Sequence, residues 1–237
     1  MPKHLKIEAV VPAAGLGLRL KSRISKSLVL IERIPIVIHT LMKLSRHNRI
    51  SGIIVLSNKK NLKKLKDLIS AYGVKKVKSV SLGGQTRKQS VARGLAYLDR
   101  NTELVLIHDG ARPFIDAATI SAVISHAEKY GAAVSGVPLK PTVKLAGRKG
   151  AKNALFVNKT LDRSGLWEIQ TPQVFKKDLI VRAHKKFKKI EATDDAYLVE
   201  KLGHRVAIVD GSYYNIKITT SEDLVFAKAI AKKIGKG

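Results

Sequence analysis

The residues best suited to phosphate chemistry follow the first apolar run of the chain. A loop of small residues comes first, made of Ala13, Ala14, Gly15 and Gly17. Such residues let backbone amides approach a triphosphate closely, and the cations Arg19 and Lys26 can then neutralise its oxygens. The loop lacks the third glycine of the dinucleotide-binding motif and the closing Gly-Lys-Ser/Thr of a P-loop. Taken alone, it is equally consistent with an ordinary turn after a strand.

A second candidate site begins at two glycines. Gly83 and Gly84 follow an apolar run, and Ser90 falls in the first turn of the helix predicted to begin at Arg87. The glycines permit a tight turn with exposed backbone amides. The Ser90 hydroxyl can then reach either a bound base or the backbone of its own helix, and the sequence leaves both readings open.

Asp109 lies where a ligand would bind in a parallel sheet. It follows the apolar run Leu104–Ile107, and the carboxyl ends of parallel strands border the ligand crevice. Its carboxylate suits a hydroxyl or a hydrated metal ion. With His108 it forms a His-Asp pair of the kind found in metal phosphohydrolases, but the other histidines show no matching spacing. We therefore expect no metal ligands from the protein.

Two further polar segments follow later in the chain. Thr193, Asp194 and Asp195 precede a predicted helix, and they read either as an N-cap with an acidic first turn or as part of a site. Lys217 lies in the β-like run 215–219, where it either guards an edge strand or binds phosphate. The sequence alone does not separate these alternatives.

Short apolar runs that alternate with helical periods must position these groups. Strands are predicted over residues 7–11, 53–56, 77–82, 104–107, 132–137 and 206–209. Helices are predicted near residues 34–46, 62–72, 87–98, 117–130, 179–188, 196–202 and 221–234, the last capped by Thr220 or Ser221. This order predicts an α/β fold with a doubly wound, mainly parallel sheet, in a single domain over residues 1–237.

Residues 138–165 break this alternation. The segment has no helical period, and it contains Pro141, Gly147 and Gly150 beside strand-like apolar residues. A structureless loop of this length is improbable inside a compact domain. We expect an extended arm, folded as a hairpin, that reaches a partner subunit.

The chain carries 45 Lys and Arg against 18 Asp and Glu, for a net charge of +27. Such a balance is typical of nucleic-acid binding, of steering of polyanionic substrates, or of helices that use Lys as their default surface residue. The lysines are spread along several predicted helices without interleaved aromatic residues. This distribution favours solvated helix faces over specific nucleic-acid binding.

Two absences narrow the class of protein. The chain has no cysteine, which excludes disulfides, thiolate metal sites and a cysteine nucleophile. The sequence contains neither a signal-peptide pattern nor an apolar run long enough to span a membrane. We expect a cytoplasmic protein that has no membrane partner.

Taken in order, the motifs resemble those of the 2-C-methyl-D-erythritol 4-phosphate cytidylyltransferase family of the non-mevalonate isoprenoid pathway. They are Ala-Ala-Gly-x-Gly-x-Arg, Gly-Gly-x-x-Arg-x-x-Ser-Val, His-Asp-Gly-Ala-Arg-Pro, Leu-Trp-x-x-Gln-Thr-Pro-Gln, Thr-Asp-Asp-Ala and Asn-Ile-Lys-Ile-Thr. The similarity extends from Ala9 to about Leu224. Several motifs in a fixed order are far more specific than any one of them.

The resemblance implies a Rossmann-like nucleotidyltransferase that uses CTP and a divalent cation such as Mg²⁺, held mainly by the triphosphate. It implies a CTP site at Ala13, Ala14, Gly15, Gly84, Ser90 and Gly110. It implies an acceptor site at Asp109, Arg112, Thr142, Arg163, Thr171 and Thr193. Catalytic roles would fall to Arg19, Lys26, Lys217 and Arg163, the last carried by the arm of the partner in a homodimer.

The implied chemistry asks for charge neutralisation rather than for a general base. A phosphate oxygen of the acceptor attacks the α-phosphorus of CTP, and this oxygen is already ionised at neutral pH. Catalysis must therefore come from bringing two polyanions together and from stabilising the charge that builds on the pentacoordinate phosphorus.

Lys26→Ala is accordingly expected to lower turnover at least about a hundredfold without unfolding the protein. The assay is pyrophosphate release from CTP, with circular dichroism as the check on folding. A variant with near-normal turnover would remove Lys26 from the mechanism.

A few positions depart from the family pattern. Ser25 and Ser27 replace the usual proline and glutamine around the loop lysine, Pro141 replaces an aspartate in the arm, and Gln85 replaces a common acidic residue. These changes leave the choice of acceptor open. Ribitol 5-phosphate cytidylyltransferases share several of the motifs and are the alternative, although Asp-Arg-Ser-Gly-Leu-Trp is closer to the methylerythritol branch. A basic nucleic-acid-binding protein is a more distant alternative.

Overall fold

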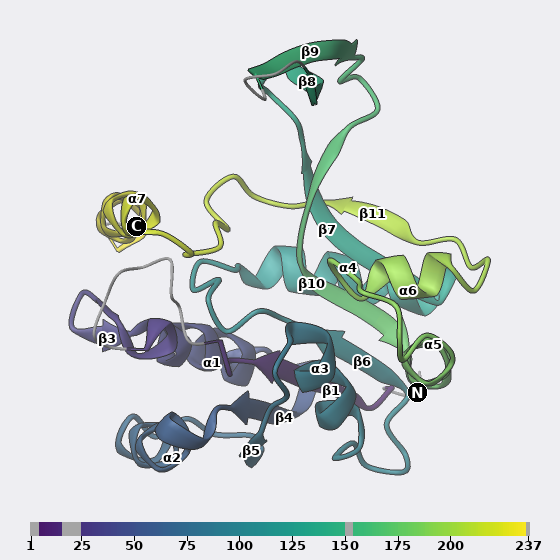
Figure 1. The fold of residues 1–237 in the computed structure, drawn as a ribbon. Helices are drawn as coiled ribbons and strands as arrows, with labels where there is room; N and C mark the ends of the chain where they lie inside the picture. The colour runs from purple at the N-terminus through teal and green to yellow at the C-terminus, as the bar shows by residue number, and fades with distance from the viewer. Residues whose placement is uncertain (1–4, 16–24, 150–153, 236–237) are drawn as a thin grey trace.

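In the part of the chain that the structure describes, seven strands form one mixed sheet at the centre of the molecule (Figure 1). The computed structural model describes residues 5–15, 25–149 and 154–235. The strand order is β11-β7-β10-β6-β1-β4-β5, and all neighbours are parallel except β10, which is antiparallel to β6 and β7. The bounds are β1 Ile7–Pro12, β4 Ile50–Ser57, β5 Val77–Leu82, β6 Leu104–Ile107, β7 Ala132–Pro138, β10 Trp167–Lys176 and β11 Ala207–Asp210.

The central strand β1 determines where a ligand can bind. Ile7, Ala9 and Val11 pack on one face and Val10 on the other, as the period-two alternation of a strand requires. β1 pairs in parallel with β4 and β6, so the carboxyl ends of three strands meet at one edge. Beyond this edge the chain enters the small-residue loop after β1 and the His-Asp pair after β6.

Helices cover both faces of the sheet. α1 (Ile36–Arg46), α2 (Leu62–Ala71) and α4 (Ala117–Tyr130) pack on one face, and α3 (Arg87–Leu95), α5 (Lys177–Lys186) and α6 (Ala196–Glu200) pack on the other. α7 (Ser221–Ile234) packs on a smaller cluster that includes Ile31 and Phe114. The predicted α/β, doubly wound and mainly parallel fold is confirmed. None of the helices within the described ranges is long and apolar enough to cross a membrane.

The predicted strands and helices are present, with ends that shift by a few residues. α7 begins with the expected cap: the Thr220 hydroxyl accepts from the backbone N–H of Asp223, whose carboxylate accepts from the Thr220 N–H. The prediction of a β-like run over 215–219 is wrong. This segment forms no strand, because it leaves the sheet and is bonded instead to the loop after β6, where the Ile218 N–H donates to the Ala111 carbonyl at 3.0 Å.

The sequence does not predict β10, the antiparallel strand that lies inside the sheet between β7 and β6. Polar residues and Pro172 interrupt its apolar pattern, and proline is normally excluded from central strands. It is tolerated because the register of β10 against β7 shifts between Ile169 and Gln173, so the ladder is interrupted where Pro172 lies. Val174 and Phe175 are fully buried and fix the rest of the strand.

Residues 138–165 leave the sheet as the predicted hairpin. β8 (Val143–Lys149) and β9 (Ala154–Leu161) pair antiparallel and project away from the sheet (Figure 1). Four apolar side chains of this arm are 54–68% exposed: Leu145, Leu155, Phe156 and Val157. The arm is therefore a structural feature of the chain, whereas the partner subunit that it would reach stays a prediction.

Candidate active site

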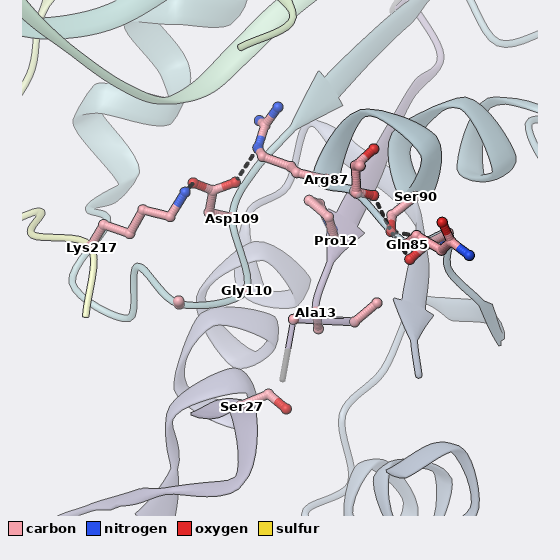
Figure 2. A pocket seen from close by; sticks show the side chains of 14 residues that line it. Pro12, Ala13, Ser27, Gln85, Arg87, Ser90, Asp109, Gly110 and Lys217 are labelled. Carbon is pink, nitrogen blue, oxygen red and sulfur yellow. Dashed lines mark hydrogen bonds and ion pairs between the residues drawn. The ribbon is translucent and has the colours of Figure 1, made fainter. Parts of the chain in front are cut away.

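A cavity of about 150 Å³ opens at the carboxyl edge of β1 and β6 (Figure 2). The small-residue loop, the glycine turn before α3 and the loop after β6 line it, and Lys217 reaches it from the segment before α7. Its lining includes Ala13, Ala14, Gly15, Gly84, Ser90, Asp109, Gly110 and Lys217. Folding thus gathers all six residues of the predicted CTP site (Ala13, Ala14, Gly15, Gly84, Ser90 and Gly110), although the role of each stays a prediction.

The turn before α3 requires that Gly83 and Gly84 have no side chain. A Cβ at Gly83 would lie 2.7 Å from the Cβ of Ala14 and from the Oγ of Ser90, and one at Gly84 would lie 2.2 Å from a side-chain carbon of α3. The close packing lets the Gly84 N–H donate to Ser90 Oγ at 3.0 Å. The Ser90 hydroxyl donates to the Thr86 carbonyl at 3.0 Å. Ser90 therefore holds the shape of the turn, and a bound base would have to share its hydroxyl with the backbone.

Asp109 is the centre of charge in the cavity (Figure 2). Its Oδ1 accepts from Arg87 Nε at 2.7 Å, its Oδ2 pairs with Lys217 Nζ at 2.7 Å, and Arg112 Nε lies 3.9 Å from Oδ2. Burial disfavours the charged carboxylate, but the three cations outweigh burial and hold the pKa of Asp109 well below its ordinary value. Asp109 is therefore ionised at neutral pH and holds Lys217 at the cavity.

Arg87 lines the same cavity, although no role is predicted for it from the sequence. Its Nη1 donates to Asp195 Oδ2 at 2.7 Å, and Oδ1 of that carboxylate pairs with His184 Nε2 at 2.9 Å. Burial opposes the charge of Arg87, but Asp109 and Asp195 together raise its pKa. The available signal was its place in the Gly-Gly-x-x-Arg motif, where a cation follows a turn suited to anions.

The acidic segment before α6 combines both of its predicted readings. Asp194 caps the helix, because its Oδ1 accepts from the backbone N–H of Tyr197 at 3.0 Å. Asp195 instead points inward to Arg87 and is 1% exposed. The segment is thus a cap at one residue and a part of the charge network around the cavity at the next.

His108 and Thr171 support the loop that carries Asp109. His108 is fully buried, which lowers its pKa to about 4 and keeps the ring neutral at pH 7. Its Nε2 lies 3.1 Å from the Arg112 carbonyl and donates to it, so Nδ1 accepts from the Thr171 hydroxyl at 3.1 Å. The same Thr171 oxygen accepts from the Asp109 N–H at 3.0 Å. The hydroxyl proton of Thr171 is therefore donated to His108 and not to the cavity.

Several residues predicted for the acceptor do not line the cavity of a single chain. Arg112 is buried, and its Nη1 donates at 2.6 Å to a backbone carbonyl in the segment before Lys217. Thr193 is exposed before α6, and Thr142 and Arg163 are exposed on the arm. Arg163 Nη1 donates to a carbonyl of the arm itself. Folding of one chain thus brings together the nucleotide residues but not the full acceptor set.

Two predicted catalytic cations fall outside the structural description. Arg19 belongs to the segment 16–24, which lies outside the described residues. Lys26 begins the 3₁₀ turn η2 (Lys26–Leu28), and its side chain also lies outside the described part of the chain. The neighbouring Ser27 lines the cavity, which locates this turn at the site.

The cavity offers little protein ligation to a metal ion. Asp109 is the one carboxylate among the described residues that line it, and both of its oxygens already pair with cations. No cluster of three or more His, Asp or Glu with metal-binding geometry occurs within residues 5–15, 25–149 and 154–235. Mg²⁺ is commonly held by one or two carboxylates together with substrate phosphates. Among the described residues of the lining, only Asp109 could give a carboxylate to a Mg²⁺, whose other ligands would be substrate phosphates and water.

Comparisons with known proteins match this arrangement over nearly the whole chain. The model of the family described as IspD, 2-C-methyl-D-erythritol 4-phosphate cytidylyltransferase, matches residues 7–233. A 2-C-methyl-D-erythritol 4-phosphate cytidylyltransferase of Pelotomaculum thermopropionicum is 43% identical over 231 residues, which cover 96% of this chain and 94% of the relative. One of Geobacillus thermodenitrificans is 42% identical over 228 residues, with 95% and 97% covered.

A solved structure agrees with the fold as well as with the sequence. The crystal structure of 4-diphosphocytidyl-2C-methyl-D-erythritol synthase from Anaerococcus prevotii is similar with a TM-score of 0.82 and 33% identity, covering 97% of this chain and all of that one. The doubly wound sheet with this cavity at its carboxyl edge is therefore that of a nucleotidyltransferase. More narrowly, the chain belongs to the 2-C-methyl-D-erythritol 4-phosphate cytidylyltransferase family.

Proposed function

We propose that this cytidylyltransferase joins CTP and 2-C-methyl-D-erythritol 4-phosphate to give 4-diphosphocytidyl-2-C-methyl-D-erythritol and pyrophosphate, in isoprenoid biosynthesis. One observation carries the proposal: the small-residue loop, the glycine turn and the Asp109–Lys217 pair surround one cavity. Relatives at 42–43% identity are named for this activity. Because both substrates are soluble phosphorylated metabolites, we expect the reaction to take place in the cytoplasm.

Lys217 is the cation best placed to assist the reaction. A phosphate oxygen of the acceptor attacks the α-phosphorus in line, the bond to the β-phosphate oxygen breaks, and its electron pair leaves with pyrophosphate. Lys217 Nζ lies beside the cavity with its side chain 39% exposed, so it can donate to an α-phosphate oxygen as negative charge builds there. A bound Mg²⁺ would neutralise charge on the triphosphate and on the departing pyrophosphate.

Asp109 holds Lys217 ready without depending on it. Its carboxylate also pairs with Arg87 and lies near Arg112, so it remains compensated when Lys217 turns toward a phosphate. A buried carboxylate with no other partner could not release its lysine without a large cost. The shared carboxylate therefore makes the transfer of Lys217 from Asp109 to a substrate feasible.

We propose that Thr142 and Arg163 complete the acceptor site of a second copy of the chain. Both are exposed on an arm that projects away from the sheet (Figure 1), whereas the cavity lies at the carboxyl edge of β1 and β6. The arm exposes apolar side chains that contact with another chain would bury. A symmetric homodimer with exchanged arms would complete both sites at once.

Pyrophosphate release from CTP and Mg²⁺ tests the function, with 2-C-methyl-D-erythritol 4-phosphate and ribitol 5-phosphate assayed side by side. We expect turnover with the methylerythritol substrate to be at least about tenfold faster, because a site built around one set of hydroxyls discriminates against another. A preference for ribitol 5-phosphate would keep the chemistry and change the acceptor. Silence with both substrates would overturn the proposal.

A further inference from the structure

The loop that follows β11 lies between the root of the arm and Lys217. The root consists of the end of β7 and the start of β10, and Figure 1 shows this loop crossing it. Residues 211–215 form the loop, and Lys217 follows two residues later. The contacts of the loop therefore determine whether the arm and the cavity can move independently.

Backbone and amide hydrogen bonds attach the loop to both strands of the root. The Gly211 N–H donates to the Gly136 carbonyl of β7 at 2.7 Å, and Gln170 of β10 donates through Nε2 to the Ser212 carbonyl at 3.0 Å. Asn215 is buried and donates through Nδ2 to Gln170 Oε1 at 3.2 Å. The chain just before Lys217 is thus bonded to the two strands from which the arm extends.

Tyr213 makes the contacts of this loop that reach farthest toward the arm. Its hydroxyl donates to the carbonyl of Pro138, the last residue of β7, at 2.7 Å. The centroid of its ring lies 3.6 Å from the Nζ of Lys140, and the two groups form a cation–π contact. The Lys140 carbonyl in turn accepts from Arg163 across the arm. Contacts therefore run without a break from Tyr213 to Arg163, which is proposed to complete the acceptor site.

We infer that Tyr213 latches the arm to the segment that carries Lys217 and is a positioning residue for the acceptor. The inference rests on the proposed roles of Arg163 and Lys217. With exchanged arms, the latch links the Arg163 that a chain gives to its partner with the Lys217 in its own cavity. Loosening the latch should weaken acceptor binding more than CTP binding, because the nucleotide residues are held by β1 and α3.

Tyr213→Phe tests the latch, because it removes the hydroxyl and keeps the ring. We expect the KM for 2-C-methyl-D-erythritol 4-phosphate to rise about three- to tenfold, the effect of one neutral hydrogen bond, with the KM for CTP unchanged and the thermal midpoint no lower than that of Tyr214→Phe. Tyr213→Leu also removes the ring beside Lys140 and should raise the acceptor KM further. Tyr214→Phe is the matched control: Tyr214 is similarly exposed, and its hydroxyl accepts from Lys233 of α7 instead.

The outcomes separate the latch from the proposed function. If the wild-type enzyme is active, equal acceptor KM values for Tyr213→Phe and Tyr214→Phe would overturn the latch and leave the proposed function in place. A parallel rise in the KM of both substrates, or a thermal midpoint clearly lower than that of Tyr214→Phe, would indicate general loosening and would also overturn it. A wild-type protein that is inactive with both acceptors would overturn the proposed function, and the latch with it.

Discussion

Lys217→Met should lower the turnover of cytidylyl transfer by about a hundred- to a thousandfold, the loss expected when one preorganised donor to a developing oxyanion is removed. Methionine keeps most of the stem and removes the charge. Folding should be preserved, because Asp109 keeps its pairing with Arg87. Pyrophosphate release at saturating substrates measures the effect. The same change at Lys228, an exposed lysine of α7, should leave turnover close to wild type.

Coexpression of two variants, each expected to be inactive alone, tests whether Lys217 of one chain acts together with Arg163 of its partner. If arms are exchanged, a heterodimer of Lys217→Met and Arg163→Ala chains has one site with both residues intact. Random pairing of coexpressed chains would then restore about one quarter of wild-type turnover, because half of the dimers are mixed and each has one good site. No recovery would mean that Lys217 and Arg163 of the same chain serve one site, and would contradict arm exchange.

Asp109→Asn should lower the free energy of unfolding by about 3 kcal/mol at neutral pH, because it leaves buried cations without their carboxylate. Turnover should fall as well, since Lys217 loses the group that holds it at the cavity. The pKa of Asp109 is held well below its ordinary value, so its stabilisation is complete above the unfolded-state pKa and is lost only as pH falls toward the folded-state value. The difference from wild type should therefore persist between about pH 5 and 8 and shrink in acid.

Urea unfolding of wild type, Asp109→Asn and Asp67→Asn measures this effect. Asp67 is exposed on α2, so the same chemical change there should cost about 0.5 kcal/mol or less. A loss in Asp109→Asn no larger than in the Asp67 control would show that Arg87 and Arg112 are adequately compensated without Asp109.

Elements with regular apolar patterns could be predicted from the sequence, and an element whose pattern is broken could not. The run 104–107 is purely apolar, and α4 has regular helical spacing, so both could be predicted with their observed bounds. β10 was missed because its middle residues are polar and include Pro172, and only the register shift against β7 makes proline acceptable there. That shift depends on two strands at once and has no local signature.

Those parts of the site that belong to short sequence motifs could be predicted. The glycine turn and Asp109 were found because their positions after apolar strands imply an edge of the sheet. Arg87 was missed because its role depends on Asp109 and Asp195, which lie 22 and 108 residues away in the chain. For Thr171 a motif implies a contact with the acceptor, which stays a prediction, and the structure adds a hydrogen bond of its hydroxyl to His108 that no local pattern indicates. Sequence motifs identify a neighbourhood, and three-dimensional partners assign the roles within it.

The hairpin arm is inserted between two strands that already pair with each other. β7 and β10 pair on both sides of the register shift, from Ala132 with Phe175 to Pro138 with Trp167, so the sheet itself holds the two ends of the arm together. Residues can be added to, removed from or exchanged within the arm without changing the register of any core strand. The part of the arm beyond its root, β8 and β9, can therefore change during evolution without altering β1 and β6, on which the nucleotide cavity is built.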